Sequence, residues 1–266
     1  MKKNKKERKN IYYLLCILIL ISTIWGLYDT FSLPNFMSSR TLLFFTIQSN
    51  IIMAIVALIL IYRLLANKKE SKLFNIFQFM GTIGVTLTFL VFFGILVPNI
   101  VKKSGITSLI SITNLTLHFA TPILSIILFA LIPNVKFKKH DYLYGTIHPL
   151  LYLFFILILD KVTDKYLFTS FNGSLSKFPY FFMDYHKNGI FTLSIKSLGL
   201  FWWIIIIAII IILISKFLLL LNKKIKHWLL SVFIILQRNR RNIHHQLLYY
   251  LKQHFHLLLH FLYQYW

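Results

Sequence analysis

Cysteine, acidic residues and charge in general are scarce in this chain of 266 residues. The single cysteine, Cys16, excludes an internal disulfide. Charged residues make up 14% of the sequence, and only 7 of them are acidic while 29 are Lys or Arg, which gives a formal net charge of +22. Hydrophobic residues make up 58%, and the mean hydropathy is +0.71. This content excludes a disordered basic protein and a soluble nucleic-acid-binding protein, and it indicates an integral membrane protein.

Long apolar segments are the main feature that is present. A helix needs about 20 mainly apolar residues to cross the hydrocarbon core of a bilayer. The apolar residues recur with a helical period or fill the segment uniformly, which predicts helices rather than a membrane β-barrel. We therefore predict an all-α bundle with six transmembrane helices. The predicted spans cover residues 11–31, 42–64, 73–98, 108–132, 142–160 and 198–221.

The beginning of the chain has the order of a signal peptide, with basic residues before an apolar run. No small-residue cleavage site follows residues 11–31, so we expect this segment to remain in the protein as its first span.

Basic residues are distributed unevenly among the predicted loops. Of the 29 bases, 20 lie before the first span, after the second, after the fourth and beyond residue 221, whereas 8 lie on the other side. The positive-inside rule therefore places both termini in the cytoplasm of a protein of the cell membrane. The chain divides into a basic N-terminus (1–10), a transmembrane domain (11–221) with an external loop at about 161–197, and a basic tail (222–266).

The tail has apolar stretches that are too short and too interrupted to cross a membrane. We expect amphipathic helices there, which bind membrane lipids and attract anionic headgroups through their bases. Its histidines are the only hint of a metal site, but no cysteine or carboxylate accompanies them, which favours a solvated or interfacial face. No metal, cofactor or nucleic-acid partner is predicted. The tail histidines in question are His244, His245, His254, His256 and His260.

Polar residues inside the predicted spans recur at helical spacing. Such groups usually face the interior of a membrane bundle, so we expect spans 2 to 5 to enclose a polar interior while spans 1 and 6 face more lipid. For most of these hydroxyl and amide groups, hydrogen bonding between helices is the simplest role. The fourth span carries one stripe, Ser111, Asn114, His118, Thr121 and Ser125, and the second span carries Thr46, Ser49 and Asn50 near its outer end.

His118 differs from these neighbours because it is the only ionisable residue deep in the fourth span. A neutral imidazole beside a hydroxyl group is the minimal unit for nucleophilic catalysis. Thr46 supplies a hydroxyl roughly one turn into the outer leaflet, whereas His118 is expected two to three turns in, and the uncertainty in the helix ends allows the two to meet. His148 begins near the opposite side of the membrane and is assigned a structural role. No G-x-S-x-G or H-E-x-x-H motif is present.

Four segments occur in a characteristic order: FFTIQSNIIMAIVALI (44–59), NLTLHFATPILSIILFAL (114–131), YGTIHPLLYLFFIL (144–157) and KFPYFFMDYHKNG (177–189). In these segments the sequence resembles a bacterial family of six-span membrane proteins of the Pr-six-Pr type, with close versions in wall-less bacteria classed as domains of unknown function. It is more distantly similar to the androgen-induced membrane proteins, which are threonine hydrolases of fatty-acid esters of hydroxy fatty acids.

The resemblance implies that Thr46 is a nucleophile and His118 its general base. Asn50 or Asn114, each one turn from a reactive residue, is expected to stabilise an oxyanion, and Thr121 is a further supporting polar residue. The expected function is hydrolysis of lipid-like esters. The alternative is a non-enzymatic small transporter or lipid-binding membrane protein that uses the same polar interior.

Overall fold

The computed structural model describes residues 2–32, 38–68, 71–132, 137–138, 140–163, 167–169, 175–194 and 197–238. In this part of the chain, six helices are long and apolar enough to cross a membrane. The predicted number of spans is confirmed, and the chain has the architecture of a multi-pass membrane protein. The six helices run Lys9–Ser32, Phe45–Leu65, Lys72–Lys102, Asn114–Leu131, Asp141–Val162 and Leu200–Ile225.

Helix α1 (Lys2–Ser32), the short α2 (Ser38–Thr41) and α3 (Phe45–Leu65) form the first part of the bundle. The third span consists of α4 (Lys72–Val91), the π-helix η1 (Phe92–Leu96) and α5 (Val97–Ser104). After the short 3₁₀-helix η2 (Ile106–Leu109), the fourth span consists of the π-helix η3 (Asn114–Ala120) and α6 (Thr121–Leu131). The predicted start of this span at residue 108 therefore belongs to a connection, and the spanning helix begins at Asn114.

Both π-helices precede a proline. Pro98 follows η1 and Pro122 follows η3. Proline has no backbone N–H and its ring clashes with the carbonyl four residues earlier, which is Gly94 or His118 here, so a regular α-helical turn is disfavoured at both places. A wider π-turn accommodates the extra space that each proline needs.

The fifth span begins with the 3₁₀-helix η4 (Asp141–Thr146) and continues as α7 (Ile147–Val162). The sixth span is part of α9 (Leu200–Arg238), which has no Gly or Pro and does not end near residue 221 as predicted. The first part of the predicted tail thus continues this helix, whereas residues 239–266, with all five tail histidines, lie outside the described residues.

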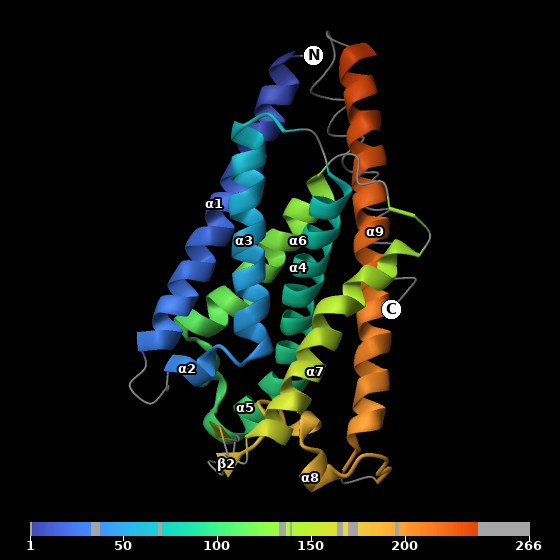
Figure 1. Cartoon of the computed structure of the whole chain (residues 1–266). Coiled ribbons are helices and arrows are strands. Elements are labelled where there is room, and N and C mark those ends of the chain that lie inside the picture. Colours follow the sequence, from blue (N-terminus) through green and yellow to red (C-terminus); the bar gives the residue numbers. More distant parts are fainter. Residues whose placement is uncertain are drawn as a thin grey trace.

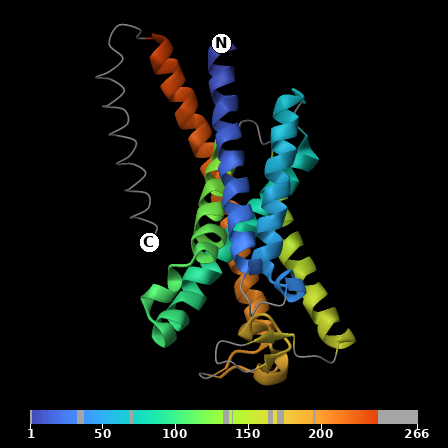
Figure 2. The same cartoon turned by 90° about the vertical axis from the view of Figure 1, so that its left-hand side faces the viewer.

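The predicted external loop folds back against the bundle between Val162 and Leu200. It contains the antiparallel pair β1 (Phe168–Thr169) and β2 (Leu175–Ser176), the 3₁₀-helix η5 (Phe181–Met183) and the short α8 (Tyr185–Asn188). We call this side of the bundle the loop end. The N-terminus and the Arg238 end of α9 lie together at the opposite end (Figures 1 and 2), as an even number of spans requires. Which end faces the cytoplasm stays a prediction.

Two clusters of buried side chains hold the spans together. One joins α1, α3 and α6 through residues such as Cys16, Met53 and Leu128, and the other joins α4, α7, α9 and the folded-back loop around Phe79 and Phe178. α1 contacts α3, η3 and α6. The prediction that the first and sixth spans face more lipid than the others holds for the sixth span and is wrong for the first. The first span is as buried as the fourth (39%), whereas the fifth and sixth spans are each 22% buried.

Candidate functional site

A cavity of about 810 Å³ lies at the loop end of the bundle. We call it the polar cavity, because Asp29, Asn114, Asp184 and Lys187 are among its lining residues. Its walls come from the ends of α1, α3 and the third span, from η3, and from residues 176–188 of the folded-back loop.

The polar cavity contains three of the residues predicted from the sequence. Thr46, His118 and Asn114 all line it. The other two supporting residues, Asn50 and Thr121, are fully buried elsewhere and are not among its described lining residues.

Thr46 is the second residue of α3, so it lies at the positive end of the helix dipole. The first N–H groups of a helix have no acceptor within the helix. The Thr46 carbonyl accepts two side-chain hydrogen bonds from residues of the same helix, from Ser49 Oγ at 3.0 Å and from Asn50 Nδ2 at 2.8 Å. The backbone of Thr46 is therefore fixed while its side chain is presented to the cavity.

Tyr180 lies beside Thr46 and was not predicted to belong to the site. Its ring contacts Phe44 edge to face, with centroids 6.2 Å apart. Burial raises the pKa of Tyr180, and hydrogen bonding from the Thr46 side chain and from the backbone of Thr46 and Phe45 opposes this rise. Tyr180 is therefore a neutral phenol at the start of α3. The only sequence signal for it is its place in the KFPYFFMDYHKNG segment, which the family resemblance already singles out.

His118 lies in η3 and is held by an aromatic stack. Its imidazole lies on the ring of Phe92 in η1, with centroids 4.0 Å apart and planes at 14°. Its Nδ1 atom is buried and has no hydrogen-bond partner in the described part of the chain. The imidazole of His118 thus lines the polar cavity. In the described part of the chain, no carboxylate accepts a hydrogen bond from its Nδ1 atom.

The acidic residues near the cavity are occupied by other contacts. Asp29 accepts hydrogen bonds from the Thr113 backbone N–H at 3.0 Å and from Thr113 Oγ1 at 2.6 Å. This contact caps the beginning of the fourth span and fastens it to the end of α1. Asp164 lies outside the described residues.

Asn50 connects the two halves of the candidate site through its amide. Its Nδ2 donates to the Thr46 carbonyl and, across the helix interface, to the Leu117 carbonyl at 3.1 Å. Leu117 directly precedes His118. The amide therefore ties the backbone of the predicted nucleophile to the backbone of the predicted base, and its donor groups point away from the cavity.

Thr121 faces α1 instead of the cavity. Its hydroxyl donates to Ser22 Oγ at 2.9 Å and lies 3.4 Å from Thr23 Oγ1. The predicted continuous stripe of the fourth span is thus divided, because the π-helix rotates the residues on either side of it relative to one another. Ser111, Asn114 and His118, which precede the division, line the cavity, whereas Thr121, which follows it, bonds to α1.

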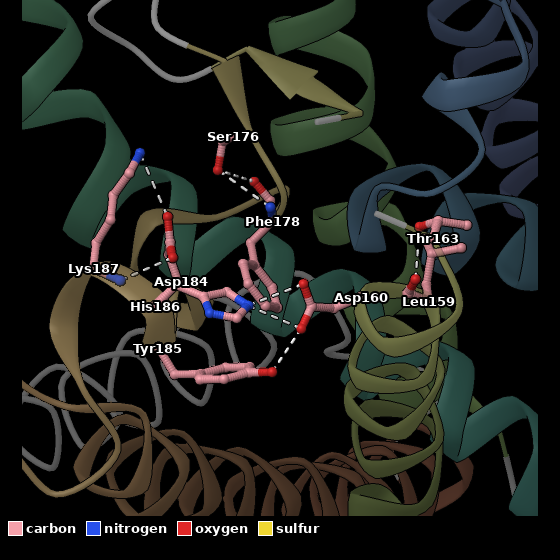
Figure 3. Close-up of polar contacts among 9 residues, drawn as sticks. All are labelled: Leu159, Asp160, Thr163, Ser176, Phe178, Asp184, Tyr185, His186 and Lys187. Carbon is pink, nitrogen blue, oxygen red and sulfur yellow. Dashed lines mark hydrogen bonds and ion pairs between the residues drawn. The ribbon is translucent and has the colours of Figure 1, made fainter. Parts of the chain in front are cut away.

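The cavity-lining loop segment is fastened to the end of α7 (Figure 3). Tyr185 donates to Asp160 Oδ2 at 2.6 Å, and His186 Nε2 lies 3.1 Å from both carboxylate oxygens. The bond to Asp160 raises the pKa of Tyr185 to about 12. Asp184 caps α8, accepting the Lys187 N–H at 3.2 Å. These contacts hold residues 178–188 in place as one wall of the cavity.

Further polar groups are buried between the helices, and one of them, His148, lies closer to Thr46 than the sequence predicted, because it contacts the residue before Thr46. His148 stacks on Phe45 with centroids 4.7 Å apart, and in the described ranges neither of its nitrogens has a hydrogen-bond partner. Gln78 Nε2 and Ser215 Oγ are also without a partner there. The described residues contain no group of three or more His, Cys, Asp or Glu able to hold a metal ion.

No family model, curated protein or solved structure matches the chain. The resemblance seen in the four sequence segments therefore stays a prediction, and the functional argument depends on the geometry of the cavity.

Proposed function

We propose that the protein is a membrane hydrolase that cleaves lipid-like esters, with Thr46 as nucleophile and His118 as general base. The observation that carries the proposal is that both side chains line one cavity among helices that are apolar enough to lie in a membrane. The cavity also has a neutral phenol and a helix N-terminus beside the threonine.

The reaction follows the usual course of a hydroxyl nucleophile. His118 takes the Thr46 proton as Oγ1 attacks the ester carbonyl, and the tetrahedral intermediate collapses by breaking the bond to the alcohol oxygen. The imidazolium returns the proton to this leaving alcohol. Water from the polar cavity then attacks the acyl-threonine, again with His118 as base, and releases the acid and free Thr46.

Of the two asparagines predicted as oxyanion donors, Asn114 is among the residues that line the polar cavity and Asn50 is not. Asn50 directs its amide to the Thr46 and Leu117 carbonyls, so its donors are engaged. Tyr180 lies next to Thr46 and accepts hydrogen bonds from the backbone N–H groups of Phe45 and Thr46. Its own O–H is the donor that we assign to the oxyanion, and the dipole at the start of α3 favours the negative charge there.

The positions of Thr46 and His118 are compatible with a site that has no substrate bound. Catalytic hydrogen bonds are often long or poorly aligned in free enzymes and shorten when the substrate binds. His118 keeps a buried Nδ1 without a described partner, so its imidazole is not committed to another acid or base through that atom.

The alternative of a small transporter receives less support from the cavity. All its lining residues come from the loop half of the bundle, from Asp29 at the end of α1 to Asn188 in α8. A lipid-binding protein without chemistry would use the same pocket, and the next experiment separates it from a hydrolase.

The test is covalent labelling of the purified protein with a fluorophosphonate probe, together with hydrolysis of a palmitoyl p-nitrophenyl ester. We expect Thr46→Ala to abolish labelling and His118→Gln to lower hydrolysis by about 100-fold or more. Ser125→Ala is the matched control, because this buried hydroxyl donates to Thr121 of its own helix. Labelling that persists unchanged in Thr46→Ala would exclude Thr46 as the nucleophile.

A further inference from the structure

A second, smaller cavity of about 200 Å³ lies next to the polar cavity and shares Thr46 with it as a lining residue. We call it the apolar cavity. Thr46, Phe92, Leu96 and Tyr180 line both cavities, so these four residues form the boundary between them. A ligand centred on Thr46 would therefore have one part in each cavity.

The wall of the apolar cavity offers almost only hydrocarbon away from this boundary. Five lining residues carry hydroxyl groups, and three of the hydroxyls are bonded elsewhere. Thr88 is 3.1 Å from Ser49 Oγ, Tyr152 donates to the Leu43 carbonyl at 3.0 Å, and Thr146 donates to the Leu143 carbonyl at 2.8 Å. The remaining two, Thr46 and Tyr180, lie at the boundary.

The apolar cavity is elongated along α9. Leu200, Ile204, Ile207, Ala208 and Ile211 line it at spacings of 3 or 4 residues, which places them on one face of that helix. From Leu200 to Ile211 this face extends over roughly 16 Å, at a rise of 1.5 Å per residue. Pro149, Leu150 and Leu153 of α7 line the cavity with them.

A narrow hydrocarbon cavity of this kind suits one unbranched chain. Its volume is below the roughly 300–1,000 Å³ of pockets that hold drug-sized molecules. Lipid tails are as apolar as the wall, so moving a chain from the bilayer into the cavity gains little. The cavity therefore selects its ligand by length and width more than by affinity.

We propose that the apolar cavity binds the acyl chain of an ester whose carbonyl lies at Thr46, and that Ala208 limits the length of that chain. The inference rests on the proposed function for the position of the carbonyl. The polar remainder of the ester then lies in the polar cavity, towards Asn114 and Lys187. The ligand class is a lipid with a single acyl chain at the reacting carbonyl.

The test uses a palmitic acid probe with a diazirine near the chain end and a terminal alkyne, bound to the full-length protein in phosphatidylcholine nanodiscs. We expect the cross-link on residues that face the apolar cavity, such as Leu153 and Ile207. Ala208→Phe should lower palmitoyl labelling by about fivefold or more, because extra volume in a filled site is poorly tolerated. A shorter octanoyl probe should lose less.

The control is Ile209→Phe, which adds the same ring one residue away on the lipid-facing side, where Ile209 is 53% exposed. It should leave labelling unchanged. A second variant, Ile211→Ala, removes volume from the wall and should raise labelling by a stearoyl probe relative to palmitoyl, which keeps the test valid if Ala208→Phe fails to fold. Cross-links on lipid-facing residues, or equal labelling in the 208 and 209 variants, would overturn the proposal.

Thr46→Ala separates this inference from the proposed function. Chain binding does not need the nucleophile, so the palmitoyl cross-link should persist in this variant. If it persists while wild-type protein shows no fluorophosphonate labelling, the acyl-chain site is upheld and the hydrolase is not. If Thr46 is labelled covalently but the cross-link is absent from α7 and α9, the hydrolase is upheld and the chain site is wrong.

Discussion

Replacement of Asn50 by Ala tests whether one amide holds the two halves of the candidate site together. The side chain is fully buried and donates to the Thr46 carbonyl at 2.8 Å and to the Leu117 carbonyl at 3.1 Å. Interhelical hydrogen bonds in membrane proteins are worth about 0.6 kcal/mol on average and up to about 1.7. The truncation also leaves a cavity, whereas the Thr46 carbonyl keeps its bond from Ser49. We expect a loss of about 1–2 kcal/mol in the free energy of unfolding.

The assay is thermal unfolding in one detergent, with fluorophosphonate labelling measured on the same samples. Labelling should fall more than stability alone explains, because Thr46 and the residue before His118 lose their common anchor. Ser125→Ala is the control, since this buried hydroxyl bonds to Thr121 of its own helix at 2.6 Å and does not bridge two helices there. If Asn50→Ala is no less stable than Ser125→Ala and is labelled at the wild-type rate, the positioning role of Asn50 is refuted.

Three further predictions concern the packing around the site. Gly26→Ala should destabilise the protein by about 1–3 kcal/mol, because the added Cβ would clash with Thr116 Oγ1 in η3. Gly94→Ala is the control and should not destabilise the protein, because nothing lies within 4 Å of the added Cβ. Equal thermal midpoints of the two variants would contradict this reasoning. Asp160→Asn should make residues 178–188 more sensitive to limited proteolysis, because Tyr185 and His186 lose their common carboxylate; an unchanged cleavage pattern would show that other contacts hold the loop. Because the folded pKa of Tyr185 is raised to about 12 from 10.0, its contribution to loop stability is complete below pH 10 and is lost as the pH approaches 12. The difference in tyrosinate absorbance between wild type and Tyr185→Phe should therefore have its midpoint near the upper value, and a midpoint at the ordinary value would contradict the bond to Asp160.

The features that depend on local pattern could be predicted from the sequence. The number of spans follows from apolar length, and all six are present. The third span has polar residues at helical spacing, Asn75, Gln78, Thr82 and Thr86, and the last three of them are buried while Asn75 is only partly buried. The meeting of Thr46 and His118 in one cavity agrees with the residues singled out beforehand. Their chemical role stays a prediction.

The features that depend on departures from a regular helix could not be predicted by spacing alone. An ideal period places Asn114, His118 and Thr121 on one face, but the π-turn before Pro122 directs Thr121 to α1. Pro122 is visible in the sequence, and in a regular helix its ring would clash with the carbonyl of His118. Residue spacing alone does not reveal this clash. Tyr180 was missed for another reason. It reaches Thr46 through a loop that folds back over many residues, and no local pattern encodes such a contact.

The two π-helices meet at the candidate site, and this coincidence argues that the site is more than a by-product of packing. Phe92 belongs to η1 and His118 to η3, and their stacked rings join the two irregular turns across the bundle. A π-turn is less stable than a regular turn and persists mostly where function requires it. Both turns also depend on a proline placed shortly after them. Substituting either proline would remove the ring that disfavours a regular α-helical turn at this place. The stacked rings thus connect the two irregular turns at the polar cavity, which Phe92, His118 and Thr46 all line.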